Sequence, residues 1–208
     1  QGLTTYYANI HRDWCWGEDE NAASYEALAA WLRDAPPSRA LVLGAGAGRL
    51  AYDLHVHTAA RTTGALAFNP LLAIVGRRVT NGERVSLYEF PLAPRDAESH
   101  AILRVLAADA PAPRELHWVL ADATRAPFVA GSFDTVVTPW LIDVVDEATL
   151  ALAGALVWEA RGAGVFSASS SGLQYALAAP WRARGWIPAL PSLPSADPVP
   201  AIAAVCGR

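Results

Sequence analysis

Three glycines at alternate positions separate a short apolar run from a helix-forming stretch. Leu41-Val42-Leu43 leads into Gly44-Ala45-Gly46-Ala47-Gly48, and Arg49 begins the next segment. Residues without bulky side chains let a ligand approach the backbone, and the start of a helix presents N–H groups to it. The pattern is typical of a strand-turn-helix unit that binds a nucleotide or nucleoside. A tight turn without a ligand is the alternative.

The spacing of this turn favours one class of cofactor over another. A dinucleotide site is expected to read G-x-G-x-x-G, with an acid about 20 residues further on. Here Arg49 occupies the third position, and no Asp or Glu stands at that distance. Methyltransferases use G-x-G-x-G for a nucleoside that carries no phosphates. The predicted cofactor is therefore S-adenosyl-L-methionine, with an NAD(P)-dependent oxidoreductase as the alternative.

A second polar position follows a later apolar run. Asp122 comes directly after the predicted strand at 116–120, and the sequence then continues through Pro127-Phe128 to Gly131-Ser132-Phe133-Asp134. A carboxylate at the end of this strand can accept a hydrogen bond from the exocyclic amine of adenine. An ordinary loop acid is the alternative for Asp122. Asp134 begins a strand, so we expect it to be structural.

The arrangement of apolar runs predicts an α/β fold. Strands that alternate with helices favour a Rossmann-like, mostly parallel sheet with helices on both faces. We expect an N-terminal helical cap at 1–36, formed by two helices, and a Rossmann-like domain at 37–208. The predicted strands are 40–43, 63–68, 84–88, 116–120, 135–138 and 164–167, and the predicted helices are 49–57, 71–79, 97–108 and 147–159.

Three sequence blocks resemble one known family. The turn and the start of its helix, Gly44 to Tyr52, closely resemble "GAGLGRLAYE" of the N2227-like family, to which carnosine N-methyltransferase belongs. His11-Arg12-Asp13-Trp14 is similar to the "VRDW" block of that family, and the segment at 136–143 is similar to its "VVTxFFID". The resemblance spans roughly 10–143. It implies an S-adenosylmethionine-dependent methyltransferase that acts on a nitrogen of a small molecule, with an imidazole-containing dipeptide such as carnosine as the specific expectation.

The resemblance and the turn together give a set of expected cofactor contacts. Arg12 or Arg49 can pair with the cofactor α-carboxylate through a charge-assisted hydrogen bond, although an arginine on a helix is usually solvated. The complete expected set is Asn9, Arg12, Gly44, Ala45, Gly46, Gly48, Arg49, Asn69, Asp122, Ala123 and Pro139.

Three residues are expected to face the methyl acceptor. Asp143 is the predicted catalytic residue, because it follows a strand end and can accept a hydrogen bond from one imidazole nitrogen while the other attacks. Capping of a helix is the alternative for Asp143. Trp14 and Trp140 can line an apolar pocket that attracts the sulfonium, and core packing is the alternative for both.

One expected group is missing. The second predicted strand should end in an acid that binds both ribose hydroxyls, but the chain has Ala67 and Asn69 there. Asn69 can still hydrogen-bond a ribose as a neutral group. A non-catalytic nucleoside-binding protein on the same fold is therefore a further alternative.

Composition excludes several other functions. The net charge is −4, without a dense Lys/Arg run, so nucleic acid is not an expected partner. The five histidines are scattered, and the two cysteines stand near opposite ends, so we expect neither a metal site nor a disulfide framework. The longest apolar stretch, 150–158, is too short for a membrane span, and a cytoplasmic location with no membrane partner is expected. The oligomeric state is left open. The absence of methionine from the 208 residues leads to the hypothesis that residues are missing, which an intact mass of 22.1 kDa would contradict.

Overall fold

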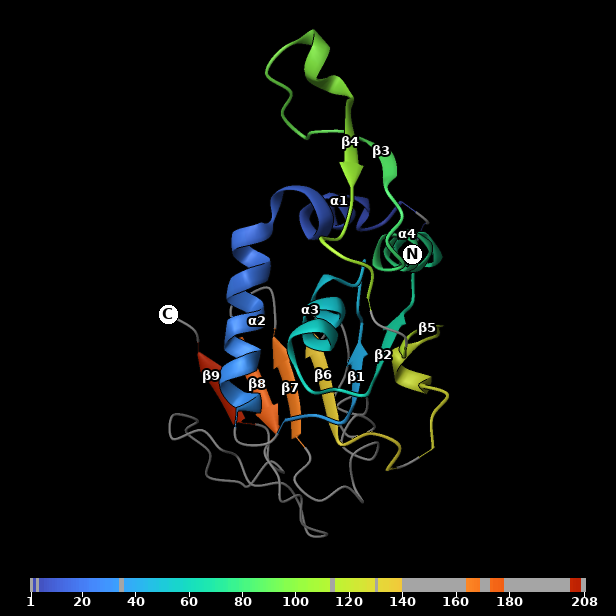
Figure 1. The fold of residues 1–208 in the computed structure, drawn as a ribbon. Coiled ribbons are helices and arrows are strands. Elements are labelled where there is room, and N and C mark those ends of the chain that lie inside the picture. The colour runs from blue at the N-terminus through green and yellow to red at the C-terminus, as the bar shows by residue number, and fades with distance from the viewer. Residues whose placement is uncertain are drawn as a thin grey trace.

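The computed structural model describes residues 2, 4–33, 36–112, 115–129 and 131–139, together with three strands at 164–168, 173–177 and 203–206. Seven strands form one sheet in the order β5-β2-β1-β6-β7-β8-β9, with helices packed against it (Figure 1). The predicted α/β fold with a mostly parallel sheet is confirmed. The strands are β1 (Arg39–Leu43), β2 (Thr62–Ala67), β5 (Leu116–Leu120), β6 (Thr135–Pro139), β7 (Gly164–Ala168), β8 (Leu173–Leu177) and β9 (Ala203–Cys206).

The five strands from β5 to β7 run parallel, and their order sets the location of a ligand site. Numbered among themselves in chain order, they follow 3-2-1-4-5, which is the Rossmann order. The order reverses between β1 and β6, where Leu41 is paired with Val136. Ligands of open α/β sheets bind outside the carboxyl ends of the strands at such a point. The glycine turn leaves β1 at this end.

Two helices follow β1 and β2 as predicted. Helix α3 (Arg49–His57) begins directly after the glycine turn, and α4 (Pro70–Thr80) begins after β2. Pro70 stands in the first turn of α4, where the absence of its N–H costs nothing, and the side chain of Asn69 accepts from the N–H of Leu71 at 2.9 Å. The predicted helix at 147–159 lies outside the described residues.

The N-terminal segment forms helical turns, as expected. It contains α1 (Tyr7–His11), a single π-helical turn η1 (Arg12–Trp16) and α2 (Glu18–Leu32). In η1 the N–H of Gly17 donates to the carbonyl of Arg12 at 2.9 Å. A Cβ on Gly17 would lie 2.5 Å from that oxygen, so only glycine closes this wide turn. We call residues 4–32 the cap.

Residues 85–106 differ from the prediction. Strand β3 (Val85–Glu89) does not join the main sheet, and the predicted helix at 97–108 is wrong. A short 3₁₀ turn, η2 (Ala97–His100), is followed by β4 (Ile102–Leu106), which pairs antiparallel with β3. Ile102 and Val105 are β-branched and favour a strand. We call β3 and β4 the ribbon, which extends away from the main sheet (Figure 1).

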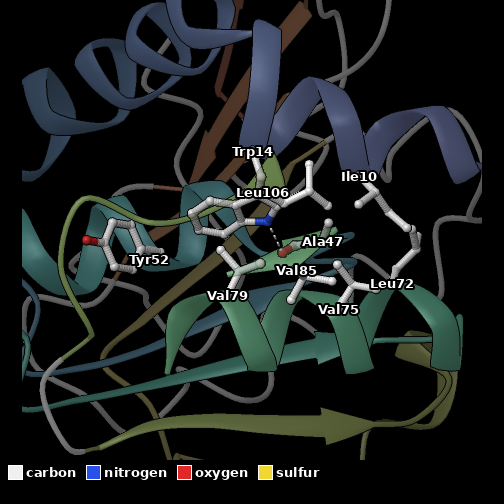
Figure 2. Close-up of a cluster of buried hydrophobic side chains, with 9 residues drawn as sticks. All are labelled: Ile10, Trp14, Ala47, Tyr52, Leu72, Val75, Val79, Val85 and Leu106. Carbon is white, nitrogen blue, oxygen red and sulfur yellow. Dashed lines mark hydrogen bonds between the residues drawn. The ribbon is translucent and has the colours of Figure 1, made fainter. Parts of the chain in front are cut away.

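Two apolar clusters hold these parts together. The first joins Leu28 of α2 and Leu54 of α3 to the central strands. The second lies between the cap, the glycine turn, α4 and the ribbon (Figure 2), and its members are Ile10, Trp14, Ala47, Tyr52, Leu72, Val75, Val79, Val85 and Leu106. The second cluster therefore fixes the cap directly against the turn.

Asp134 has the structural role expected for it. Its carboxylate accepts from the N–H of Ser38 at 3.1 Å and from the N–H of Arg39 at 2.8 Å, which joins the starts of β6 and β1. None of the helices among the described residues is long and apolar enough to cross a membrane.

Candidate cofactor site

The turn after β1 uses the backbone freedom of all three of its glycines. The φ angles of Gly44, Gly46 and Gly48 are 67°, 60° and 91°, in the left-handed region that other residues rarely adopt. The N–H of Ala45 donates to the carbonyl of Leu66 at 2.8 Å, which ties the turn to the end of β2. The turn is therefore a fixed loop at the carboxyl edge of the sheet.

The glycines of the turn differ in what surrounds them. A Cβ on Gly48 would lie 2.4 Å from the Trp118 ring, so this glycine is required by packing. Among the described residues, a Cβ on Gly46 would have one atom within 4 Å, the Oδ2 of Asp13 at 3.9 Å. Within the described part of the chain, the space beside Gly46 is open enough to receive part of a ligand, whereas the space beside Gly48 is filled by protein.

Asp13 of the cap is directed at the turn. Its side chain is buried, and its Oδ1 pairs with Arg12 Nη2 at 2.9 Å. Burial raises the pKa of Asp13, against the lowering effects of Arg12 and of the backbone N–H groups of Arg49 and Ala47. The N–H groups at the start of α3, which bind phosphate in dinucleotide sites, therefore face a carboxylate of the protein itself.

Trp14 binds the carbonyl group of Ala47, whose N–H faces Asp13. The indole Nε1 donates to the carbonyl oxygen of Ala47 at 2.8 Å, as the dashed line in Figure 2 marks. The ring meets Tyr52 edge-on at 5.6 Å, and the Arg49 guanidinium lies 5.6 Å from the ring centroid. Trp14 is buried in the second cluster, as the core-packing alternative expected. From this position it also contacts the turn.

Both candidate arginines take part in ion pairs. Arg49 Nε lies 2.9 Å from Asp53 Oδ2, one helical turn further along α3. Arg12 pairs with Asp13 and lies 3.9 Å from Glu20. About a fifth of each arginine side chain is exposed, so both are partly accessible to solvent. Binding a cofactor carboxylate would require either arginine to share or exchange its acidic partner.

Asp122 lies at the carboxyl end of β5, next to the end of β2. The N–H of Ala121 donates to the carbonyl of Ala67 at 3.1 Å. Asp122 Oδ1 accepts from the N–H and the hydroxyl of Thr124, each at 2.8 Å, and these bonds hold the pKa of Asp122 below its usual value. The carboxylate is exposed, so it remains ionised and accessible to a donor on a ligand.

Asn69, the expected ribose contact, uses its side chain for hydrogen bonds to the backbone of the protein. Asn69 Oδ1 caps α4, and Asn69 Nδ2 donates to the carbonyl of Thr5 in the cap at 3.0 Å. Asn69 is buried, and Ala67 ends β2 without a polar side chain. Asn69 thus joins α4 to the cap, and its binding of a ribose stays a prediction.

The other expected contacts are spread around the carboxyl edge of the sheet. Asn9 lies in α1, Ala123 is buried in the 3₁₀ turn η3 (Ala123–Arg125), and Pro139 ends β6. Trp140 and Asp143 lie outside the described residues. The structure therefore brings the cap, the turn and the end of β5 to one edge, and the acceptor residues stay predictions.

His11 is a buried titratable group at the same end of the cap. Among the described residues, neither ring nitrogen has a hydrogen-bond partner. The Tyr7 ring lies 5.2 Å away, edge-on. Burial lowers the pKa of His11, and the charge of nearby Glu89 only partly opposes this effect.

The lowered pKa makes stability depend on pH with a definite sign. As the pH decreases below about 6.5, the unfolded chain takes up a proton at His11 before the folded chain does. The free energy of unfolding therefore decreases as the pH decreases. We expect His11→Leu to remove this loss between pH 7.5 and 5.5 and to raise stability at pH 7.5 by about 1 kcal/mol. Urea unfolding at both pH values measures the effect, and His100→Leu, at an exposed histidine, is the control. A pH dependence equal to that of the unmodified protein would contradict the prediction.

The sequence did not indicate a role in the site for three residues, Asp13, Gly76 and Trp118. Asp13 stands within the block that resembles the N2227-like family, but that block directed attention to Arg12. The contact of Trp118 with Gly48 and Gly76 joins β5, the turn and α4, and no local pattern links residues so far apart.

Solved structures with similar folds are consistent with this architecture. A chain in the complex of the Haloferax volcanii Trm112 methyltransferase activator with a proposed methyltransferase has a TM-score of 0.53 and 16% identity, covering 79% of this chain and 58% of its own. A proposed S-adenosylmethionine-dependent methyltransferase from Methanococcus maripaludis has a TM-score of 0.51 and 12% identity, covering 70% and 53%. The [4+2]-cyclase SpnF has a TM-score of 0.50 and 11% identity, covering 71% and 44%.

These likenesses define the class of fold. The chain has the fold of class I S-adenosylmethionine-dependent methyltransferases and spans about half the length of the matched proteins. Because a [4+2]-cyclase has a similar fold, the fold alone does not fix the reaction.

Sequence comparisons give one short similarity. No protein-family profile matches the chain, so the resemblance to the N2227-like family stays a prediction. A 3-oxo-isoapionate kinase from Paraburkholderia graminis is 76% identical over 67 residues, which are 32% of this chain and 14% of the kinase. This fraction of the kinase is too small to carry its activity to the present chain.

Proposed function

We propose that this chain binds S-adenosyl-L-methionine at the glycine turn and transfers the methyl group to a nitrogen of a small molecule. The observation that carries the proposal is the combination of open space at Gly46 with the Asp13 carboxylate at the start of α3. A nucleoside without phosphates can lie in the space beside Gly46. It does not need the N–H groups at the start of α3, which Asp13 occupies. The topological switch point between β1 and β6 supports the same location.

The same observation disfavours the NAD(P) alternative. A pyrophosphate normally lies on the N–H groups at the start of the first helix. Here the buried Asp13 side chain already accepts hydrogen bonds from the N–H groups of Ala47 and Arg49, so these donors are occupied and cannot bind a pyrophosphate.

The described residues fit an adenosyl cofactor in part. Asp122 is ionised, and among the described residues its Oδ2 has no hydrogen-bond partner, so it can accept from the adenine amine. The backbone at Gly46 would lie against the cofactor, and Arg12 or Arg49 would meet its α-carboxylate. Ala67 offers nothing to the ribose hydroxyls, which leaves a non-catalytic nucleoside-binding protein as the second candidate.

The bound cofactor would supply an electrophilic methyl group on a sulfonium. Displacement at that carbon needs little covalent help, so the protein would act mainly by holding the nucleophile close and aligned. We propose that Asp143 accepts a hydrogen bond from one imidazole nitrogen of the acceptor and thereby directs the lone pair of the other nitrogen to the methyl group. Trp140 would line the acceptor pocket, and the cap would exclude water.

Asp122 provides a test of the adenine contact. We expect Asp122→Asn to weaken S-adenosylhomocysteine binding by about 10-fold, because a charge-assisted hydrogen bond becomes a neutral one. Asp96 is a matched control, since it is also an exposed aspartate that caps a 3₁₀ turn, by accepting from the N–H of Ser99 at 2.8 Å. Asp96→Asn should leave the affinity unchanged, and equal affinities for both variants would assign Asp122 to capping alone.

Asp143 separates catalysis from cofactor binding. We expect Asp143→Asn to bind S-adenosylhomocysteine normally and to lower kcat/KM for methyl transfer to imidazole dipeptides by at least ~10-fold. Transfer of labelled methyl from S-adenosylmethionine measures the rate. If Asp143 is only a helix cap, asparagine should replace it with full activity. Binding without any transfer in the unmodified protein would favour the non-catalytic candidate.

A further inference from the structure

The cap contacts the glycine turn through two neighbouring residues of the π-helical turn η1. The Asp13 carboxylate accepts a hydrogen bond from the N–H of Ala47, and the indole of Trp14 donates to the carbonyl of the same residue at 2.8 Å. All three residues are buried. The cap therefore holds both backbone polar groups of Ala47.

These contacts act on the backbone that follows Gly46. The N–H of Ala47 belongs to the planar peptide group that joins Gly46 to Ala47, so its bond to Asp13 restricts rotation about the Cα–C bond of Gly46. On the other side, the N–H of Ala45 donates to the carbonyl of Leu66 at 2.8 Å. Glycine has the most backbone freedom of all residues. The cap and β2 thus fix from two sides the residue against which the cofactor is proposed to lie.

Asn21, near the start of α2, holds η1 in this arrangement. Its side-chain Nδ2 donates to the carbonyl of Arg12 at 3.2 Å and to the carbonyl of Asp13 at 3.3 Å. Its backbone N–H donates to the carbonyl of Gly17 at 2.9 Å. The π-helix is rare, occurs mostly as single turns and is frequent at functional sites. Asn21 therefore supports the backbone from which both contacts to the glycine turn are made.

We propose that Asn21 is a positioning residue of the cofactor site, which presets the glycine turn by holding η1. The ligand of that site rests on the proposed function. The hydrogen bond that closes η1 joins residues five apart, whereas α-helical bonds join residues four apart. Without the two bonds from the Asn21 side chain, η1 can relax toward the α-helical spacing. This change would rotate Asp13 and Trp14 relative to α2 and loosen their hold on the turn.

Hydrogen exchange of the unliganded full chain tests the positioning role without reference to the cofactor. We expect Asn21→Ala to lower the protection of the Ala47 N–H by about 10-fold, because its bond to Asp13 opens more often when η1 can relax. The N–H of Ala45 should keep its protection, since its acceptor, the carbonyl of Leu66, belongs to β2. Alanine is the best helix former, so the substitution favours α2 and leaves the protein folded.

Calorimetric titration with S-adenosylhomocysteine measures the consequence for the site. We expect Asn21→Ala to raise the dissociation constant about 10-fold. Ser24→Ala is the matched control, because Ser24 also lies in α2 and its hydroxyl donates to the carbonyl of Glu20 at 2.9 Å, within the same helix. It should bind normally. In a chain that carries Asp13→Ala, Asn21→Ala should change the affinity by less than about 3-fold, since the main contact through which Asn21 acts is already lost.

The two measurements separate the positioning role from the proposed function. Unchanged protection of the Ala47 N–H in Asn21→Ala would overturn the positioning role, and so would an unchanged affinity when the unmodified protein binds S-adenosylhomocysteine. Effects of Asn21→Ala and Asp13→Ala that add in full would overturn it as well, because the two residues would then act independently. If the protection falls but the unmodified protein binds no S-adenosylhomocysteine, the hold of Asn21 on the turn is supported and the proposed cofactor is wrong.

Discussion

Replacing Gly46 with valine should abolish cofactor binding while the protein stays folded. The new side chain would enter the space beside the turn, where Asp13 Oδ2, at 3.9 Å from the Cβ, is the one close neighbour that the described residues supply. We expect the affinity for S-adenosylhomocysteine to fall by at least ~100-fold, because the branched side chain takes the place of ligand atoms. The φ angle of 60° adds a folding cost of about 1–2 kcal/mol, which leaves a folded protein. Calorimetric titration and urea unfolding measure the two effects separately.

Gly82 is the control for backbone strain at Gly46. It has a φ angle of 90° in the turn after α4, and a Cβ there would lie 2.7 Å from Pro111 Cγ, away from the proposed site. Gly82→Val should destabilise the protein at least as much and leave the affinity unchanged. If Gly46→Val binds S-adenosylhomocysteine as well as the unmodified protein, the cofactor does not contact the turn.

Replacing Gly76 or Gly48 with alanine should produce the largest losses of stability. A Cβ on Gly76 would lie 2.3 Å from the carbonyl oxygen of Ala47 and 2.4 Å from the Trp118 ring, and a Cβ on Gly48 would lie 2.4 Å from the same ring. We expect each variant to lose about 3 kcal/mol in the free energy of unfolding, because α4 and β5 must move away from the turn. Urea unfolding measures the loss.

The two glycines differ in which atom they meet, and this difference gives a sharper test. Trp118→Leu should relieve the steric clash of Gly48→Ala, which is with the ring alone, and should leave the strain that the φ angle of 91° imposes on alanine. It should relieve less of the effect of Gly76→Ala, because the Ala47 carbonyl belongs to the backbone and cannot yield. Gly64→Ala is the mild control, since its Cβ would meet the end of a leucine side chain at 3.0 Å. Equal costs at the three glycines would contradict this account of the packing.

The strands and helices that repeat a simple pattern could be predicted from sequence. The apolar run at 40–43 followed by glycines predicted β1 and the turn, and the apolar stretch at 71–79 predicted α4. The stretch at 97–108 could not be predicted, because its alanines suggest a helix while its strand forms only by pairing with β3. Pairing between distant segments is a tertiary effect that overrides local preference.

The placement of the glycine turn and of Asp122 in the fold was predictable, whereas several contacts around them were not. The turn and Asp122 lie at one edge of the sheet, as the motifs implied. The motif gave no indication that Asp13 lies against the turn or that Asn69 holds the cap, because these contacts depend on how the cap docks. The predictions for Trp140 and Asp143 concern residues outside the described part of the chain.

Calorimetric titration of the unmodified protein with S-adenosylhomocysteine and, separately, with NADH is the most direct test of the central claim. The open space at Gly46 and the carboxylate at the start of α3 predict that S-adenosylhomocysteine binds at a single site and that NADH does not bind. Binding of NADH, or failure of S-adenosylhomocysteine to bind to the folded protein, would contradict the proposed cofactor.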